Sequence, residues 1–211
     1  MNKKIFIFSN ESISTESNNF HCDNLDMKSI PEGLRNDFEV NLIARRSKIK
    51  RRHEINNVKI DLANNILSFI QKILATIKNK EKSKFFIISI TPYTFIAAIV
   101  LSLFKIKPYV YLRSDGYEEY NSIIGITGKF VYHIMFEITS KISSLISCRK
   151  HILREKKGIV VSPSHLSDKW MQNLKAVNLN EINLLYVGRI RVEKGIFSLL
   201  NLFEKIKKNI F

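Results

Sequence analysis

Two cations near the end of the chain stand where a strand turns toward a helix. An apolar run of strand length leads directly into Gly188 and Arg189, and Lys194 and Gly195 precede an apolar-periodic segment. A glycine permits a tight turn, a guanidinium is a planar fork of donors, and the start of a helix attracts anions. The spacing predicts a site that binds a diphosphate. An ordinary strand-turn-helix with a solvated Arg and Lys is the structural alternative.

Residues 186–195 resemble the beginning of the nucleotide-sugar domain of family-4 glycosyltransferases, which have the two-Rossmann-domain architecture called GT-B. In that family, the Arg and Lys that match Arg189 and Lys194 hold the diphosphate of the donor. The resemblance implies donor-diphosphate binding at Gly188, Arg189, Lys194 and Gly195. It also implies retaining transfer of a sugar from a nucleotide-sugar donor to a hydroxyl of a glycan or lipid-linked acceptor, in cell-envelope polysaccharide or lipid-linked glycan synthesis.

The sequence departs from the family pattern after residues 186–195. Family members continue for a second Rossmann domain, which carries an E-x7-E motif that contacts the donor sugar and ribose. Residues 196–211 do not contain this motif. The resemblance therefore implies a fragment, or a second chain that completes the C-terminal domain, and we expect the isolated chain to be inactive.

Weaker candidates follow the first apolar run. Family members often have a glycine-rich loop there, whereas this chain has Ser9, Asn10, Glu11 and Ser12. Asn and Ser side chains form turns and hydrogen bonds. We therefore predict substrate contacts from Asn10 and Ser12, with a solvated surface loop as the alternative.

A second group of polar residues follows the apolar run 109–112. Ligands of doubly wound sheets gather at the carboxyl ends of strands. Arg113, Ser114 and Gly116 are predicted substrate contacts, and Asp115 is the candidate catalytic residue, since the resemblance places a His or an Asp at this strand end. The alternative is structural: an Arg113–Asp115 pair, with Asp115 capping the next segment.

Apolar runs of strand length alternate with longer helical periods, which predicts an α/β fold with a doubly wound parallel, Rossmann-like sheet. We expect strands at 4–8, 39–44, 85–90, 108–113, 145–148, 158–162 and 183–187. We expect helices at 62–78, 93–104 and 128–141, the last with Val131, Ile134, Met135 and Ile138 on its apolar face.

The composition of the sequence changes after Ser162, where a polar segment begins. We predict an N-terminal Rossmann-like, acceptor-side domain at 1–163, an interdomain linker at 164–180, and the truncated start of a nucleotide-sugar-binding domain at 181–211. At the junction with the linker the chain has Ser162, Pro163 and Ser164, where the resemblance leads one to expect an Asn-Gly turn.

The chain is basic: 34 Lys and Arg against 19 Asp and Glu give a net charge of +15. Such an excess favours anionic partners, among them nucleotide sugars and an anionic membrane surface. Because no nucleic-acid motif accompanies the charge, no nucleic acid is expected as a partner. A basic membrane-associated or nucleic-acid-binding protein without enzymatic activity is the alternative class.

The two cysteines, Cys22 and Cys148, lie far apart without a C-x-x-C spacing, which favours a reducing compartment. We expect no metal and no cofactor. Residues 85–104 carry no formal charge and are numerous enough to span a bilayer. A strand followed by a buried helix is favoured instead, because Thr91 and Pro92 are typical of a helix start. We expect a cytosolic protein, or one peripheral to the cytosolic membrane face.

Overall fold

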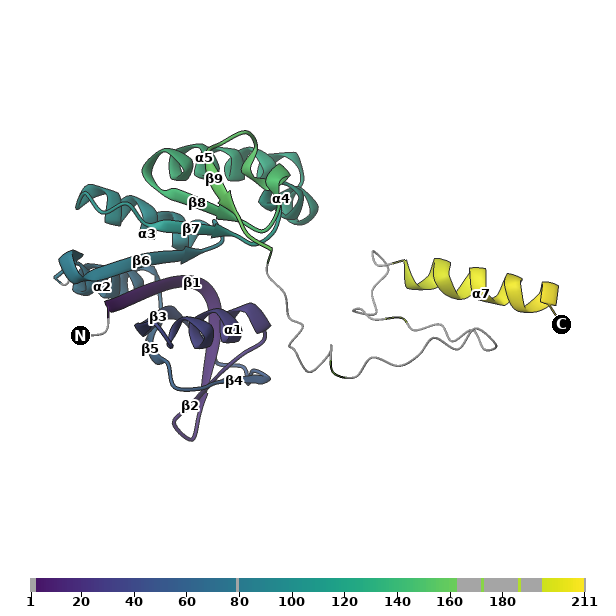
Figure 1. Ribbon diagram of the computed structural model, residues 1–211, viewed down its shortest axis with the longest axis horizontal. Coiled ribbons are helices and arrows are strands. Elements are labelled where there is room, and N and C mark those ends of the chain that lie inside the picture. Colours follow the sequence, from purple (N-terminus) through teal and green to yellow (C-terminus); the bar gives the residue numbers. More distant parts are fainter. Residues whose placement is uncertain (1–2, 79, 163–171, 173–185, 187–194, 211) are drawn as a thin grey trace. The chain divides into compact units, whose positions relative to one another are not determined.

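The computed structural model describes residues 3–78, 80–162, 172, 186 and 195–210. The chain divides into two compact units, Met1–Pro163 and Ser164–Phe211 (Figure 1). In the second unit, helix α7 spans Ile196–Ile210. Most of the predicted linker 164–180 and of the predicted strand 183–187 lies outside the described residues.

A mostly parallel sheet forms the centre of the first unit (Figure 1). Its parallel strands follow the order β5-β3-β1-β6-β7-β8-β9. Their bounds are β1 Lys3–Glu16, β3 Phe38–Arg46, β5 Lys59–Ala63, β6 Ser83–Ile88, β7 Tyr109–Leu112, β8 Ser144–Ser147 and β9 Gly158–Val160. Strands β3 and β5 follow β1 in the sequence and are added on one side of it, whereas β6, β7, β8 and β9 are added in turn on its other side. This order confirms the predicted α/β class and the Rossmann-like sheet.

Strand β1 is longer than the predicted strand 4–8. Its pairing with β3 shifts register between Phe8 and Ser12, and the strand then continues to Glu16. This distal half pairs antiparallel with β2 (Asn19–Cys22), which pairs antiparallel with β4 (His53–Ile55). A shift of this kind bends a strand, so β1 leaves the parallel sheet just after the residues that line the candidate site.

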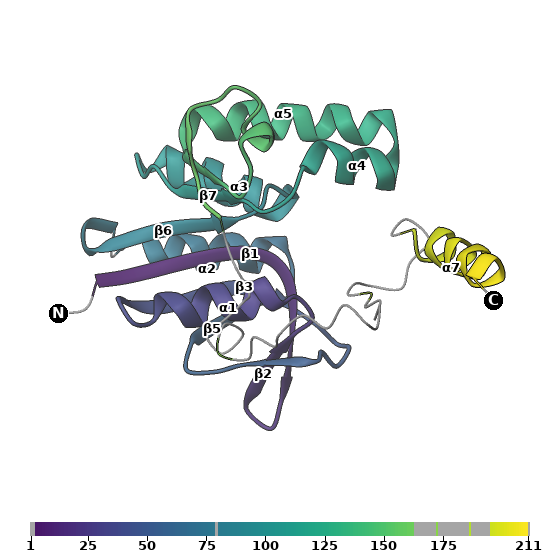
Figure 2. The same cartoon turned by 45° about the vertical axis from the view of Figure 1, so that its right-hand side comes forward.

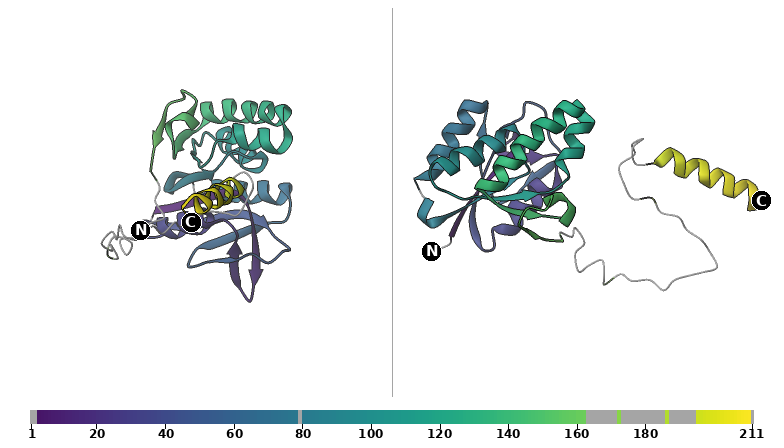
Figure 3. Two further views of the ribbon diagram at one scale, coloured as in Figure 1. Left: turned by 90° about the vertical axis from the view of Figure 1, so that its right-hand side faces the viewer. Right: turned by 90° about the horizontal axis from the view of Figure 1, so that it is seen from above.

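Helices cover both faces of the sheet. One face packs against α1 (Leu25–Leu34), and the other packs against α2 (Ile66–Ile77), α3 (Pro92–Leu103) and α5 (Ile126–Ile142), as Figure 3 shows. Helix α4 (Gly116–Ile124) packs against α5. A strand that is covered on both faces directs successive apolar side chains to opposite sides of the sheet, and β1 does so. Phe6 and Phe8 belong to the core on the α2–α3–α5 side, and Ile5 and Ile7 belong to the core on the α1 side.

The predicted helix 62–78 begins too early. Leu62 belongs to β5, which pairs in parallel with β3. Helix α2 begins only at Ile66, because Asn65 and Ser68 form a capping box in which each side chain bonds the backbone of the other. Only Asn64 and Asn65 separate the end of β5 from the start of α2, and neither is a glycine or a proline. The sequence therefore contains no clear boundary between the strand and the helix, and the helix was predicted to begin too early.

The predicted apolar face of the helix 128–141 is also wrong in part. Met135 is buried as expected, but Val131, Ile134 and Ile138 are exposed. The buried side of α5 instead presents Gly128, Tyr132, Met135, Phe136 and Thr139.

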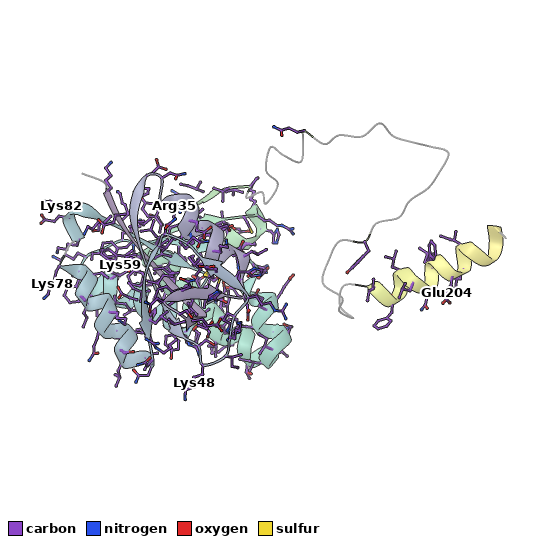
Figure 4. The ribbon with its side chains drawn as sticks, turned by 90° about the horizontal axis from the view of Figure 1, so that it is seen from below. Arg35, Lys48, Lys59, Lys78, Lys82 and Glu204 are labelled. Atoms are coloured by element: carbon purple, nitrogen blue, oxygen red, sulfur yellow. The ribbon has the colours of Figure 1, made fainter. Side chains whose placement is uncertain are left out.

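The uncharged segment 85–104 forms a strand and a helix, as predicted. Most of it belongs to β6 and α3, and Thr91 caps α3 with Pro92 in its first turn. Among the described helices, none is both long enough and apolar enough to cross a membrane. Many of the cations lie at the periphery of the first unit; Arg35, Lys48, Lys59, Lys78 and Lys82 are exposed there (Figure 4).

Candidate functional site

A polar pocket lies where the building direction of the sheet reverses, between the carboxyl ends of β1 and β6. Open α/β sheets bind ligands at such a switch point, because the loops on either side diverge and leave a crevice. The pocket has a volume of about 140 Å³ and is lined by Ser9, Asn10, Glu11, Asn24, Met27, Ile88, Ser89, Thr91 and Arg113. It therefore contains two of the predicted contact residues, Asn10 and Arg113.

The β6 side of the pocket is held in an uncommon backbone conformation. Ser89 has a φ of 60°, which is left-handed and unfavourable for a residue with a side chain. Its N–H donates to the carbonyl of Tyr111 at 2.9 Å, and its carbonyl accepts from the Thr94 hydroxyl at 2.8 Å. These bonds hold Ser89 in place, so the β6–α3 turn presents the N-terminus of α3 to the pocket.

Asn10 is oriented by an arginine from the neighbouring strand. The Arg45 guanidinium donates from Nη1 to Asn10 Oδ1 at 3.2 Å and also lies over the Tyr93 ring, 5.0 Å from its centroid. Since the amide oxygen faces Arg45, the amide NH₂ group of Asn10 remains able to donate to a ligand. Asn10 is thus a positioned donor.

Arg113 is held in place by an ion pair with a residue of α1. Its Nη1 donates to Asp26 Oδ2 at 3.1 Å, and Asp26 lies in the first turn of α1. Asn24 caps the same helix by accepting from the Asp26 N–H at 3.0 Å. A guanidinium has five N–H donors, so a pair of this kind leaves others for an anion or a hydroxyl.

Glu11 is the carboxylic acid of the pocket. Burial raises the pKa of Glu11, while a backbone N–H from Asp23 and the charges of Arg113 and Arg51 oppose the rise. A carboxyl group with a perturbed pKa in a cleft is a candidate for proton transfer or for hydroxyl binding. Together, these residues offer donors and acceptors suited to a polyhydroxylated or phosphorylated ligand.

Glu11→Gln is expected to remove part of the pH dependence of stability. Because the pKa of Glu11 is raised in the folded protein, the folded state binds the proton more tightly than the unfolded chain does. The contribution of Glu11 to stability is therefore greatest at low pH and is lost as pH rises from the ordinary carboxyl range through the raised pKa. In urea denaturation across pH, the free energy of unfolding of the variant should therefore rise relative to that of the wild type as pH increases through this range.

Glu118→Gln is the control, since Glu118 lies exposed on α4. The control should retain the wild-type profile of unfolding free energy against pH. A Glu11→Gln variant that also retains the wild-type slope would contradict the burial of Glu11.

Asp115 lies outside the lining of this pocket, and both of its carboxylate oxygens have partners. Oδ1 accepts from the Tyr117 N–H at 2.9 Å and so caps α4, as the structural alternative proposed; Oδ2 accepts from Arg154 Nη2 at 2.6 Å. The Arg113–Asp115 pair does not form, since each residue pairs elsewhere. A catalytic role for Asp115 stays a prediction.

The other predicted contacts are placed as follows. Ser12 follows the register shift in β1 and is opposite Arg45 on β3, and Ser114 lies half-buried between β7 and α4; neither lines the pocket. Gly116 is buried, and a Cβ there would overlap the Tyr132 ring. Gly116 does not line the pocket either, and the glycine is required there for packing.

The predicted diphosphate residues Gly188, Arg189 and Lys194 lie outside the described residues. Gly195 is described: it is exposed, has a φ of 70°, and its carbonyl accepts from the Leu199 N–H at 3.0 Å at the start of α7. A left-handed φ favours glycine at this position.

Burial raises the pKa of Cys22 to about 11, so its thiol stays protonated at neutral pH and is a poor nucleophile.

A second hollow, of about 970 Å³, lies along residues 150–160. Its lining comes from one crossover connection and not from converging strand ends, so we place the site at the switch point. Within the described residues, no cluster of three or more His, Cys, Asp or Glu forms a metal site.

Sequence reasoning missed several residues of the pocket, chiefly Glu11, Asn24 and Ser89. The position of Asn24 before an apolar segment is a recognisable helix-cap signal. Glu11 lies in the polar run 9–12 after the first predicted strand, between the two residues, Asn10 and Ser12, that were predicted as contacts. The same position at a strand end would have identified Glu11 as well. The left-handed conformation of Ser89 leaves no mark in the sequence.

Comparison with known proteins gives little further guidance. No protein-family model and no curated protein matches the sequence. Among solved structures, the chain is similar to a protein of Listeria monocytogenes assigned as a UDP-N-acetylglucosamine 2-epimerase, with a TM-score of 0.40 and 12% identity. The match covers 72% of this chain and 41% of that protein. The assignment of the fold therefore relies on the strand order alone.

Proposed function

We propose that the chain belongs to a glycosyltransferase that takes a sugar from a nucleotide-sugar donor and transfers it to a hydroxyl of a glycan or lipid-linked acceptor. The observation that carries the proposal is the run 186–195, in which Arg189 and Lys194 are spaced to bind a diphosphate. Gly195, left-handed at the start of α7, is consistent with a backbone that brings a helix N-terminus to an anion.

The switch-point pocket supports the same class of ligand. Its volume, about 140 Å³, is below the roughly 300–1,000 Å³ of ordinary small-molecule sites, so it is suited to one polar group of a larger ligand. Asn10, Glu11 and Arg113 would bind hydroxyls of an acceptor. We infer no metal and no cofactor, because charge on the diphosphate would be balanced by Arg189 and Lys194.

Isothermal titration of the chain, joined to or mixed with a polypeptide that completes its C-terminal domain, with a panel of uridine- and guanosine-diphosphate sugars tests the proposal. At least one nucleotide sugar should bind, and the free sugar should give no heat at the same concentration, because the diphosphate carries the predicted contacts. Absence of binding across the panel, or equal binding of random oligonucleotides, would contradict a nucleotide-sugar site.

A further inference from the structure

The turn between α4 and α5 exposes an unusual concentration of large apolar side chains. Figure 2 shows this turn at the end of the α4–α5 pair. The apolar tip comprises Ile123, Ile124, Ile126 and Phe130, of which Ile126 is 83% exposed and Phe130 is 63% exposed. Ile134 and Ile138 continue the tip along α5 as exposed residues at four-residue spacing, which places them on one face of the helix.

Helix α5 cannot turn this face inward, because its other side is already packed. Tyr132 stacks against Phe136 and contacts the rings of Tyr117 and Tyr120, and Phe136 is fully buried. Gly128 lies so close to the Tyr120 carbonyl that a Cβ would not fit. Large contiguous apolar surfaces that remain in water usually mark an interaction site.

Cations accompany the exposed apolar face of α5. Lys129 adjoins Phe130 in the tip, Lys141 follows Ile138 near the other end of the helix, and Lys156 Nζ lies 2.8 Å from Glu137 Oε2, three residues from Ile134. Residues 126–157 contain seven Lys and Arg and two Glu. Asp115 and Glu137 are both paired with cations of the segment 150–157, Asp115 with Arg154 and Glu137 with Lys156. The exposed acidic residues Glu118 and Glu119 lie on α4.

We propose that the apolar tip inserts into the surface of an anionic phospholipid bilayer, with the bordering cations against the lipid phosphates. Interfacial segments that combine apolar side chains with flanking Lys and Arg bind in this way, at the boundary between headgroups and acyl chains. The proposal does not depend on the proposed glycosyltransferase function, since it requires only this surface.

The position of the tip gives the interaction a direction. Helix α5 has 17 residues, which is roughly 25 Å at 1.5 Å per residue, and it leads to the first residues of β8. Because β8 has only four residues, α5 extends past the carboxyl end of the sheet, and the tip lies on the side of the switch-point pocket. A bilayer bound there would face the pocket.

A second copy of the chain is the other occupant that an apolar face suggests. A two-fold interface brings the same patch of both copies together. Here it would place Lys129 of one copy near Lys129 of the other, and like charges oppose such contact. The charge pattern therefore favours lipid.

Vesicle co-sedimentation tests the proposal, with phosphatidylcholine vesicles and with vesicles of phosphatidylcholine and phosphatidylglycerol at a two-to-one ratio. The wild-type chain should pellet with the anionic vesicles. Ile126→Ser combined with Phe130→Ser should reduce partitioning roughly tenfold or more, because two apolar side chains no longer enter the bilayer. Lys129→Gln combined with Lys141→Gln should reduce binding to the anionic vesicles by roughly tenfold.

Leu103→Ser is the matched control, since Leu103 is 75% exposed but is the last residue of α3, which leads to the amino end of β7 and so lies at the opposite edge of the sheet from the tip. This control should bind as the wild type does, and unchanged thermal unfolding should show that all variants are folded. Failure of the wild type to pellet, or equal binding by the Ile126/Phe130 variant, would overturn the proposal. A dimer in light scattering that the same variant abolishes would also overturn it, by assigning the tip to self-association.

Discussion

Gly116→Ala is expected to destabilise the first unit by about 1–3 kcal/mol or more, which is typical of overpacking in a rigid core. A Cβ on Gly116 would overlap the Tyr132 ring. The ring cannot move aside easily, because it is buried and contacts the rings of Tyr117, Tyr120 and Phe136. Urea denaturation followed by circular dichroism measures the free energy of unfolding.

Gly33→Ala is the matched control for this prediction. Gly33 lies in α1, and nothing lies within 4 Å of the position where its Cβ would be. Alanine is favoured over glycine in a helix by up to about 1 kcal/mol, so this variant should be equal to or more stable than the wild type. Equal stability of Gly116→Ala and the wild type would show that the α4–α5 packing is wrong.

Phe136→Ala is expected to cost about 3–5 kcal/mol, the usual range for deleting a fully buried aromatic side chain. Phe136 has no exposed surface, and its ring lies 5.7 Å from that of Tyr117 and 6.2 Å from that of Tyr132, measured between centroids. The variant removes the centre of this aromatic cluster and leaves a cavity. Its urea midpoint should fall accordingly.

Phe130→Ala provides the comparison on the same helix. Phe130 is largely exposed, so its replacement should change the free energy of unfolding by no more than about 0.5 kcal/mol. If the two variants were equally destabilised, the buried and exposed faces of α5 would not be those described above.

The parallel sheet could be predicted from the sequence because its strands are short, apolar and separated by polar turns. The runs around Ile87 and Val110 are so apolar that their burial on both faces follows from composition. Strands β2 and β4 were missed because they have only four and three residues and include polar side chains. Helix α1 was missed because Pro31, inside it, argues against a helix.

The face of α5 shows where periodicity fails. Apolar residues occur around most of this helix, so the pattern alone does not decide which side is buried. Packing decides it: Gly128 permits close approach to α4, and the three large residues Tyr132, Met135 and Phe136 then fill the interior. The apolar residues left outside form the proposed lipid-binding tip.

The candidate site was predictable only in part. Asn10 and Arg113 were found because the ends of parallel strands meet at one edge. Their partners Arg45 and Asp26 come from distant positions in the chain, 35 and 87 residues away, and no local pattern reveals such pairs. Asp115 satisfied the same rule as Arg113, but its carboxylate bonds Arg154 and the start of α4.

Calorimetric titration of the best nucleotide sugar from the panel into Arg189→Ala and Lys194→Ala variants of the protein with its C-terminal domain completed is the most direct test of the proposed function. Each substitution removes a charge-assisted contact worth roughly 1.5–3 kcal/mol, so each should weaken binding by about tenfold or more. Lys205→Ala, which changes an exposed cation on α7, should bind as the wild type does. Unchanged affinity in both the Arg189 and the Lys194 variant would contradict a diphosphate site at 188–195.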